Sequence, residues 1–252
     1  MLRSVDEITG YTLAATDGEV GRCWDFLFDD TMWVVRYMIA DTRKWLPGRK
    51  VLISPILLGT PDWETRRFPV DLTKDAIRAA PPLREDAPVS RQYEAEYFRH
   101  YEIPFYWVSD AAWGAYMTPA AARAAARAEE ADEGDIGPAG GDPHLRSINE
   151  VTDYRVEALD GEVGKVSDFI LDDEPWIVRY LVFDTGSWLS GRKVLVAPDW
   201  VRRIDWPQQS LSVDMTQEHV ENSPVFDPSQ PINREYEAQL YDFYGRPRYW
   251  SR

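Results

Sequence analysis

Hydrophobic positions recur at every second residue in short runs along the chain, and turn-forming residues separate these runs. In the clearest run, residues 33–41, the side chains of Trp33, Val35, Tyr37 and Ile39 share one face of an expected strand. Similar β-rich runs predict further strands at 11–15, 20–28, 49–54, 57–59 and 65–70. Short strands separated by turns about every ten residues are typical of a small β-barrel or β-sandwich.

A helical pattern follows the expected strands. Thr73 stands where a helix N-cap belongs and predicts a short helix through residue 80. Ser90 predicts a second N-cap, after which Tyr93, Tyr97 and Tyr101 recur four apart on one helix face. The segment closes with Pro-Phe-Tyr-Trp at 104–107. We expect these aromatic side chains to pack as a lid on the β-structure, because packing is far commoner for them than ligand stacking.

The whole pattern occurs twice, with an offset of 143 positions and no gap. Arg3-Ser4 recurs as Arg146-Ser147, and the expected N-caps recur as Thr216 and Asn233. The longer matches are Asp-Gly-Glu-Val-Gly at 17–21 and 160–164, Trp-(Val/Ile)-Val-Arg-Tyr at 33–37 and 176–180, Gly-Arg-Lys-Val-Leu at 48–52 and 191–195, Arg-x-Tyr-Glu-Ala at 91–95 and 234–238, and Tyr-Trp at 106–107 and 249–250. About 45 of roughly 106 aligned positions are identical. We therefore predict two copies of one fold, at residues 1–107 and 144–252, each of about 105 residues.

Residues 108–143 match neither copy and predict an Ala-rich, acidic linker. Thr118 and Pro119 mark a helix start, and the Ala-rich stretch 120–133 continues it. No large apolar side chain occurs in that stretch, so we expect a solvated helix followed by a flexible segment. Trp113, Tyr116 and Met117 are the exception and are expected to pack on a domain.

The chain is acidic, with 252 residues, a formal net charge of −15 and a sequence pI near 4.6. This balance argues against direct binding of nucleic acid, which needs clustered Lys and Arg, and against docking on an anionic membrane. No apolar run long enough for membrane insertion occurs, and acidic residues follow the first five positions, where a signal peptide would be apolar. A single cysteine excludes an internal disulfide. Together these features predict a cytoplasmic protein.

The acidity is uneven along the chain. Residues 1–107 hold 14 basic and 17 acidic side chains, whereas residues 144–252 hold 12 and 19. The first copy is therefore the one that we expect to tolerate an anionic partner, and the second copy suits a basic one.

No catalytic set emerges from the sequence. His100, His144 and His219 each align with a different residue type in the other copy, so none is a repeated ligand. Cys23 aligns with Val166, which favours a semi-buried strand position over a nucleophile. Neither a nucleophile elbow nor a phosphate-binding glycine loop occurs. We therefore predict a protein that is not an enzyme and has no cofactor and no metal site.

Acidic turns are the one chemical alternative. The carboxylates at 29–30 and 172–174 could coordinate Ca²⁺ or Mg²⁺. Asp in a turn more commonly accepts hydrogen bonds from its own backbone, which is the interpretation that we favour. At the strand ends, we expect Asp41 and Asp184 to form ion pairs with Arg36, Arg179 or the Arg-Lys dipeptides at 49–50 and 192–193.

Tryptophan and tyrosine are the source of the candidate interaction residues. The chain holds 11 Trp and 13 Tyr against 9 Phe, and both types are enriched at protein interfaces. The candidates are Trp63, Trp206, Tyr93, Tyr97, Tyr236, Tyr106, Trp107, Tyr249 and Trp250. Two related copies could also pack about a pseudo-two-fold axis, like a homodimer within one chain.

These motifs, in this order and seen twice, resemble PRC-barrel domains. Such domains form the cytoplasmic part of the photosynthetic reaction-centre H subunit and the C-terminal domain of the ribosome maturation factor RimM. The resemblance covers about the first 70 residues of each copy, and the tail of each copy resembles stand-alone bacterial PRC-barrel proteins. It implies a mainly β fold: two small PRC-like barrels, each followed by short helices and an aromatic tail, joined by the Ala-rich helical or flexible linker.

The resemblance implies a non-catalytic binding module. Neither a preceding transmembrane helix nor a RimM-type N-terminal barrel occurs in the sequence, so the specific roles of those two proteins are not carried over. We expect a protein-interaction or assembly module with an unidentified protein partner. The alternatives are a ribosome-associated or RNA-processing accessory factor that acts through protein contacts, and a peripheral photosynthetic or membrane-assembly factor.

Overall fold

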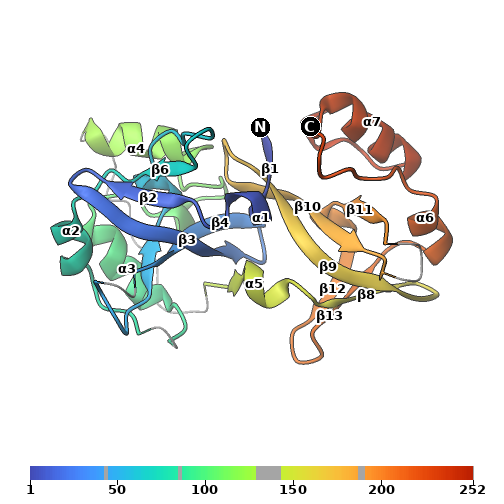
Figure 1. Cartoon of the computed structure of the whole chain (residues 1–252), viewed down its shortest axis with the longest axis horizontal. Coiled ribbons are helices and arrows are strands. Elements are labelled where there is room, and N and C mark those ends of the chain that lie inside the picture. The colour runs from blue at the N-terminus through green and yellow to red at the C-terminus, as the bar shows by residue number, and fades with distance from the viewer. Residues whose placement is uncertain (43–44, 85–86, 129–142, 187–190, 252) are drawn as a thin grey trace. The chain divides into compact units, whose positions relative to one another are not determined.

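The computed structural model describes residues 1–42, 45–84, 87–128, 143–186 and 191–251. The chain is mainly β, and its strands form a curled sheet that resembles half a barrel (Figure 1). It divides into two compact units. Unit 1 comprises Asp6–Asn149 together with Met1 and Asp172–Ile177, and unit 2 comprises Leu2–Val5, Glu150–Leu171 and Val178–Arg252.

The strands of unit 1 are built around one long strand. β3 pairs antiparallel with β2 through its first residues, with β4 along most of its length, and with β7 at its end. β4 also pairs with β5, and β2 pairs in parallel with β6. The bounds are β2 Thr12–Ala15, β3 Gly18–Asp29, β4 Val34–Asp41, β5 Val51–Ile53, β6 Arg67–Pro69 and β7 Leu145–Ser147. Register shifts within β3 bend this strand, which lets one strand contribute to several sides of the curled sheet.

Helices cover the strands of unit 1, and side-chain caps fix where they begin. Thr73, Ser90 and Thr118 each accept a hydrogen bond from a backbone N–H in the first turn of a helix, as expected for N-caps. The bounds are α1 Val5–Ile8, α2 Lys74–Ala79, α3 Arg91–His100, α4 Pro119–Arg127 and α5 Ile148–Val151, with short 3₁₀ helices η1 at Pro55–Leu57 and η2 at Tyr106–Val108.

Unit 2 repeats this plan. β9 pairs antiparallel with β8, and β13 pairs in parallel with β8 and antiparallel with β12. β10 pairs with β11, and β1 pairs with β9. The bounds are β1 Leu2–Ser4, β8 Arg155–Ala158, β9 Gly161–Asp172, β10 Ile177–Asp184, β11 Lys193–Val196, β12 Val201–Asp205, β13 Ser210–Val213, α6 Gln217–Glu221, α7 Arg234–Phe243, η4 Pro198–Trp200 and η5 Tyr249–Ser251.

The expected N-caps and the order of strands and helices agree with the structure, but two local expectations were wrong. Residues 57–59 do not form a strand: Leu57 ends η1, and Leu58 makes a single bridge to Val70. The Ala-rich helix is not solvated on all sides. α4 packs against η1 with Ala122 fully buried, because a stripe of Ala side chains lets the backbone approach closely. The rest of the predicted helix, residues 129–133, lies outside the described residues.

The strand arginines exclude one of the alternatives left open for Asp41. Arg36 pairs with Asp29 instead. Its guanidinium is 1% exposed, donates to the Asp29 carboxylate at 3.1 Å, and lies over the Tyr106 ring. In the second repeat Arg179 lies over the ring of Tyr249, 4.2 Å from its centre. Arg36 is therefore buried, and Arg179 partly buried, against the aromatic tails, where an aromatic face compensates part of the lost hydration.

Candidate functional site

A buried glutamate holds the aromatic tail of each repeat. Glu94 of α3 is fully buried and accepts hydrogen bonds from the Tyr37 and Tyr106 hydroxyls, both at 2.8 Å, and from Arg91 at 2.7 Å. Burial raises the pKa of Glu94, and the pKa values of Tyr37 and Tyr106 are also raised by burial. The network ties a helix, a strand and the tail together.

The second repeat contains the same network at the 143-residue offset. Glu237 accepts from the hydroxyls of Tyr180 at 2.8 Å and Tyr249 at 2.9 Å, and it pairs with Arg234 at 3.0 Å. The repetition of every member, together with the burial of both carboxylates, favours a structural role for these residues.

A second repeated constellation fastens the first strand of each repeat, β1 or β7, which we call the leading strands. In unit 1, Asp25 of β3 accepts a hydrogen bond from the Ser147 hydroxyl of β7 at 2.6 Å. Its other oxygen accepts from the backbone N–H groups of Phe26 at 2.7 Å and Asn149 at 3.1 Å. Asp25 is only 6% exposed, and burial raises its pKa although these hydrogen bonds and Lys50 oppose the shift.

Unit 2 has the matching contact. Asp168 of β9 accepts from the Ser4 hydroxyl of β1 at 2.5 Å and from the backbone N–H of Phe169 at 2.7 Å. Each leading strand is therefore held by one serine hydroxyl on one carboxylate of the strand that it joins.

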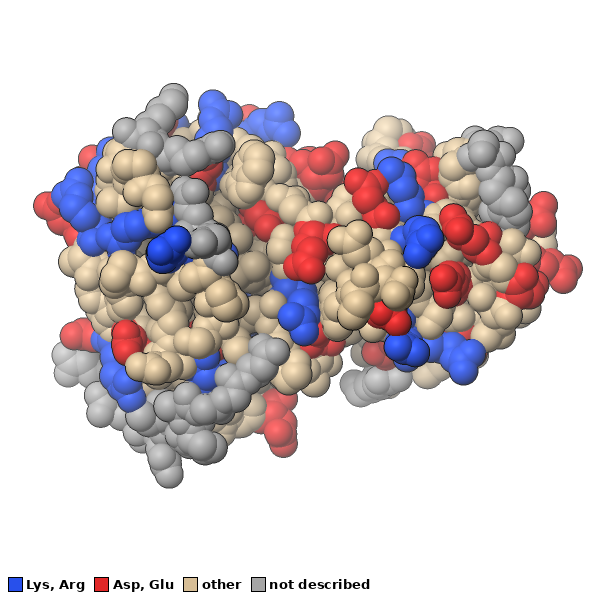
Figure 2. Space-filling view, turned by 90° about the horizontal axis from the view of Figure 1, so that it is seen from below, with Lys and Arg blue, Asp and Glu red and all other residues tan. Residues whose placement is uncertain are grey.

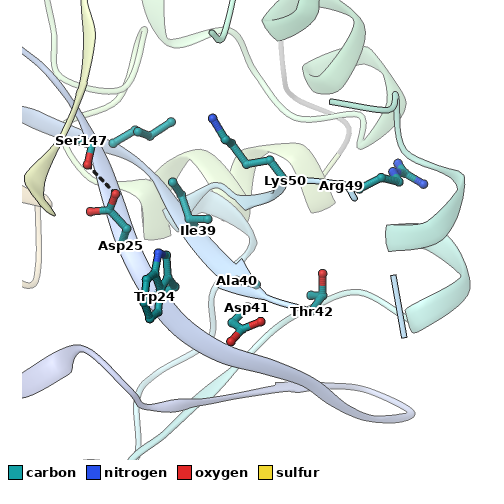
Figure 3. A pocket seen from close by; sticks show the side chains of 10 residues that line it. Trp24, Asp25, Ile39, Ala40, Asp41, Thr42, Arg49, Lys50 and Ser147 are labelled. Carbon is teal, nitrogen blue, oxygen red and sulfur yellow. Dashed lines mark hydrogen bonds between the residues drawn. The ribbon is translucent and has the colours of Figure 1, made fainter. Parts of the chain in front are cut away.

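The best-defined hollow of unit 1 lies beside this contact (Figure 3). Its volume is about 380 Å³, and its lining residues are Trp24, Asp25, Leu27, Ile39, Ala40, Asp41, Thr42, Arg49, Lys50 and Ser147. The Trp24 indole is 55% exposed, which is unusual for the largest side chain. The close-up shows this indole beside Asp25 and Ile39, with Lys50 on the opposite wall. An open apolar surface with charged groups at its margin suits a side chain from another protein.

A polar group inside the hollow also lacks a partner. The Thr42 hydroxyl is buried and makes no hydrogen bond to any residue that the structure describes, whereas its counterpart in the second repeat, Thr185, donates to the carbonyl of Arg192 at 3.0 Å. Leaving a buried hydroxyl unsatisfied costs about 1–3 kcal/mol, so a group that gives Thr42 a partner would recover that cost.

The second repeat differs from the first at four positions of this hollow. Ile170 and Val182 replace Leu27 and Ile39 with little change of size, and the other two replacements change the side-chain size strongly. Phe183 stands where the first repeat has Ala40, and its side chain is fully buried. Ser167 stands where the first repeat has Trp24, and its hydroxyl donates to the carbonyl of Val182 at 3.3 Å. The volume that the second repeat fills with its own phenyl ring is therefore left open beside Trp24 in the first repeat.

A second kind of depression occurs in both repeats near the Asp-Gly-Glu-Val-Gly turn. Its volume is about 350 Å³ in unit 1, where Glu19, Arg22 and Trp45 line it, and about 390 Å³ in unit 2. On the molecular face seen in Figure 2, acidic and basic side chains are interspersed. In the described parts of the chain, no three His, Cys, Asp or Glu side chains gather to form a metal-binding group.

The acidic turn of the first repeat has the backbone role that we favoured. Asp29 accepts from the N–H groups of Thr31 at 2.9 Å and Met32 at 3.2 Å. Cys23 is buried, as the alignment with Val166 suggested, and burial raises the pKa of its thiol. No helix within the described residues has the length and apolar character needed to cross a membrane.

The interaction candidates chosen from the sequence are mostly engaged in packing. Tyr97 and Tyr106 are buried, while Trp63 packs on Tyr11 and Phe68 and Trp206 packs on Tyr154. The remaining five are partly exposed and belong to the helix faces and tails: Tyr93, Tyr236, Trp107, Tyr249 and Trp250. Of the three linker residues that were expected to pack, Trp113 is buried in unit 1 and donates to the carbonyl of Pro175, and Tyr116 is partly buried. Met117 is exposed, so the expectation was wrong for that residue.

Sequence reasoning missed Trp24 and the leading strands. Trp24 could have been found from the repeat itself, because it and Ala40 are neighbouring positions at which the two copies differ strongly in side-chain size. The recurrence of Arg-Ser at 3–4 and 146–147 marked the leading strands, but no pattern in a single sequence tells which strand a short segment joins. No protein-family model matches this chain, and no curated protein matches it.

Proposed function

We propose that this protein is a non-catalytic protein-interaction and assembly module of the cytoplasm, built from two PRC-barrel-like repeats. The repeats are residues 1–107 and 144–252, and the Ala-rich acidic linker joins them. The observation that carries the proposal is the exposed Trp24 indole in the open hollow of the first repeat. The partner is a protein that inserts a large side chain beside this indole.

The energetics of such a contact support the hollow as a docking site. A tryptophan side chain buries on the order of 150–250 Å² when it is covered, and aromatic anchors in pockets carry much of the affinity of protein interfaces. Trp24 has more than half of its surface still available. At about 25 cal/mol per Å² of apolar surface, covering that fraction contributes roughly 2–3 kcal/mol, which is the size of an interface hot spot.

Comparison of the two repeats supports assigning the hollow to binding. The first repeat has Trp24 and Ala40 where the second has Ser167 and Phe183. If this difference served packing alone, the Trp24 indole would be buried over Ala40, as Phe183 is buried in the second repeat. The indole is instead exposed, and the buried Thr42 hydroxyl, which lines the same hollow, has no hydrogen-bond partner among the described residues. A ligand side chain in the hollow would cover the indole, and a polar atom beside it could satisfy that hydroxyl.

Affinity capture with variants borrowed from the second repeat tests this function. The tagged full-length chain is incubated with native lysate beside Trp24→Ser, which removes the indole, and Ala40→Phe, which fills the hollow. We expect a stoichiometric partner that both variants lose by about tenfold or more, since a hot spot of roughly 2 kcal/mol corresponds to that factor. Leu159→Ser is the control, because Leu159 is 52% exposed and lies outside the hollow.

The pattern of losses decides between outcomes. A partner that binds Trp24→Ser and Ala40→Phe as well as it binds the unchanged chain would contradict docking in the hollow. The identity of a partner that is lost with both variants separates the expected classes: a ribosomal protein points to ribosome association, and a subunit of a membrane complex points to membrane assembly.

A further inference from the structure

Each leading strand pairs with the sheet of the other repeat. β7 opens the second repeat and pairs antiparallel with β3 of the first repeat, with Ser147 opposite Leu27 and Leu145 opposite Asp29. β1 opens the first repeat and pairs with β9 of the second repeat. Each compact unit consequently contains a segment that belongs in sequence to the other repeat, namely Leu2–Val5 in unit 2 and residues 145–149 in unit 1.

The two docking arrangements use the same groups. Besides the two serine–aspartate hydrogen bonds, the Asp30 N–H donates to the carbonyl of His144 at 3.0 Å, and the Asp173 N–H donates to the carbonyl of Met1 at 3.0 Å. Both leading strands have the sequence Leu-Arg-Ser. Both acceptor strands contain Asp-Phe, at 25–26 and 168–169. Both end on the first residue of an Asp-Asp pair, at 29–30 and 172–173.

Each leading strand is therefore interchangeable between molecules. The same strand from a second copy carries every group that its acceptor strand contacts within one copy. Exchange of identical segments between protein molecules forms dimers with few new contacts, because the contacts of the single molecule are reused.

We propose that β3 and β9 are acceptor strands for the leading strands of a second copy of this chain, and that two copies assemble by exchanging these strands. In the assembly, the second copy supplies Ser147 to the hollow beside Trp24, so this site is shared by two molecules. The inference is independent of the proposed docking function, since it concerns the pairing of β7 with β3 and not the occupant of the hollow.

The exchange is governed by concentration. Within one copy, each leading strand and its acceptor strand belong to the same covalent chain, which keeps them together. Such a connection corresponds to an effective concentration on the order of 1 mM. After the chains have been unfolded and refolded together, roughly half of them are therefore expected in exchanged dimers at a chain concentration of about 1 mM. At about 10 µM the expected fraction is about one in a hundred.

A pair of single-cysteine variants tests the pairing directly. Leu27 and Ser147 are cross-strand partners that both line the hollow, and opposite residues of antiparallel strands lie at the separation that a disulfide spans. Leu27→Cys and Ser147→Cys are made in separate full-length chains that also carry Cys23→Ala. The two variants are refolded together from urea at about 1 mM and oxidised. Only a strand from another molecule can then bring the two thiols together.

We expect a covalent heterodimer in the mixture that is at least about tenfold more abundant than any dimer formed by either variant alone, and that disappears on reduction. A chain carrying both cysteines provides the geometric control and forms the disulfide internally. Leu27→Cys mixed with Leu159→Cys measures random collision. An internal disulfide in the double variant without a heterodimer in the mixture overturns the proposal.

Unsubstituted chains provide a second measurement that depends on no variant. ¹⁵N-labelled and unlabelled protein are refolded together at about 1 mM, and native mass spectrometry is used to follow dimers. Dimers of intermediate mass that become rarer after refolding at about 10 µM support exchange, whereas monomers alone at both concentrations exclude it.

Discussion

At the scale of single residues, Asp25 links strand pairing to pH. Burial raises the pKa of its carboxyl from the ordinary 3.8, so the folded protein holds this proton more tightly than the unfolded chain does. The contribution of Asp25 to stability is therefore greatest below pH 3.8 and declines as the pH rises through the raised pKa.

Asp25→Asn isolates this effect. The amide keeps the hydrogen-bonding shape, because its oxygen accepts from the two backbone N–H groups and its nitrogen donates to the Ser147 hydroxyl. We expect the unfolding free energy of the unchanged protein, relative to Asp25→Asn, to fall as the pH rises from about 4 through the raised pKa, by about 1.4 kcal/mol for each unit of pKa elevation. Urea titrations of both proteins across this range measure it, and a difference that stays constant or rises would contradict the burial argument.

Glu94 is the residue whose loss should cost most. Glu94→Ala leaves the Tyr37 and Tyr106 hydroxyls and Arg91 without their buried acceptor, and removing one member of a buried pair costs about 3–5 kcal/mol. Glu237→Ala is the matched change in the second repeat. We expect a smaller loss there, because Arg234 is 57% exposed and can regain water. Equal losses, measured by urea unfolding, would contradict a role for burial.

At the scale of elements, one glycine of each repeat fixes how two strands meet. Gly21 does so for β3 and β4, and Gly164 for β9 and β10. A Cβ at Gly21 would overlap the carbonyl oxygen of Asp41, and a Cβ at Gly164 would overlap that of Asp184. We expect Gly21→Ala to destabilise the protein by about 2–4 kcal/mol. Gly10→Ala separates this clash from backbone strain, since Gly10 also has positive φ but nothing lies near its added Cβ. A loss of only about 1 kcal/mol is expected for Gly10→Ala, and losses of equal size would rule out the close approach as the cause.

The same scale separates what the sequence predicts from what it does not. The strands over 34–41 and 12–15 and the N-caps Thr73 and Ser90 were predictable, because alternation and capping act between residues close in sequence. The state of residues 57–59 was not, since an apolar triplet has no period that distinguishes a strand from a 3₁₀ turn. The acid paired with Arg36 was also missed, because Asp41 and Asp29 both lie near β4 and only burial selects Asp29.

The candidate site followed the same division. Enrichment in Trp and Tyr pointed to Tyr97 and Tyr106, but aromatic side chains at helical spacing also build cores, and both are buried. Trp24 is exposed and lies at a register shift between Cys23 and Asp25 in the pairing of β3 with β4. At such a shift, strict alternation no longer tells which face of the strand a residue occupies. Exposure at such a position depends on the three-dimensional bend of the strand, which periodicity does not encode.

At the scale of the whole molecule, the leading strands make each unit depend on both repeats. Unit 1 also contains Trp176, which is 5% exposed and packs on Phe26 and Phe68. Neither repeat can therefore unfold without removing a strand from the sheet of the other. Cooperativity should extend over the chain although it contains two compact units.

Equilibrium unfolding tests this coupling. We expect a single urea transition in which tryptophan fluorescence and far-ultraviolet circular dichroism coincide, as for a two-state protein. Ser147→Ala removes a hydrogen bond to a buried carboxylate and should lower the unfolding free energy by about 1.5–3 kcal/mol while leaving one transition. Ser4→Ala, which removes the matching bond to Asp168, should shift that same transition. Two transitions, each moved by only one of the two serine changes, would mean that the units unfold independently. The pairing of each leading strand with the other repeat would then not couple them.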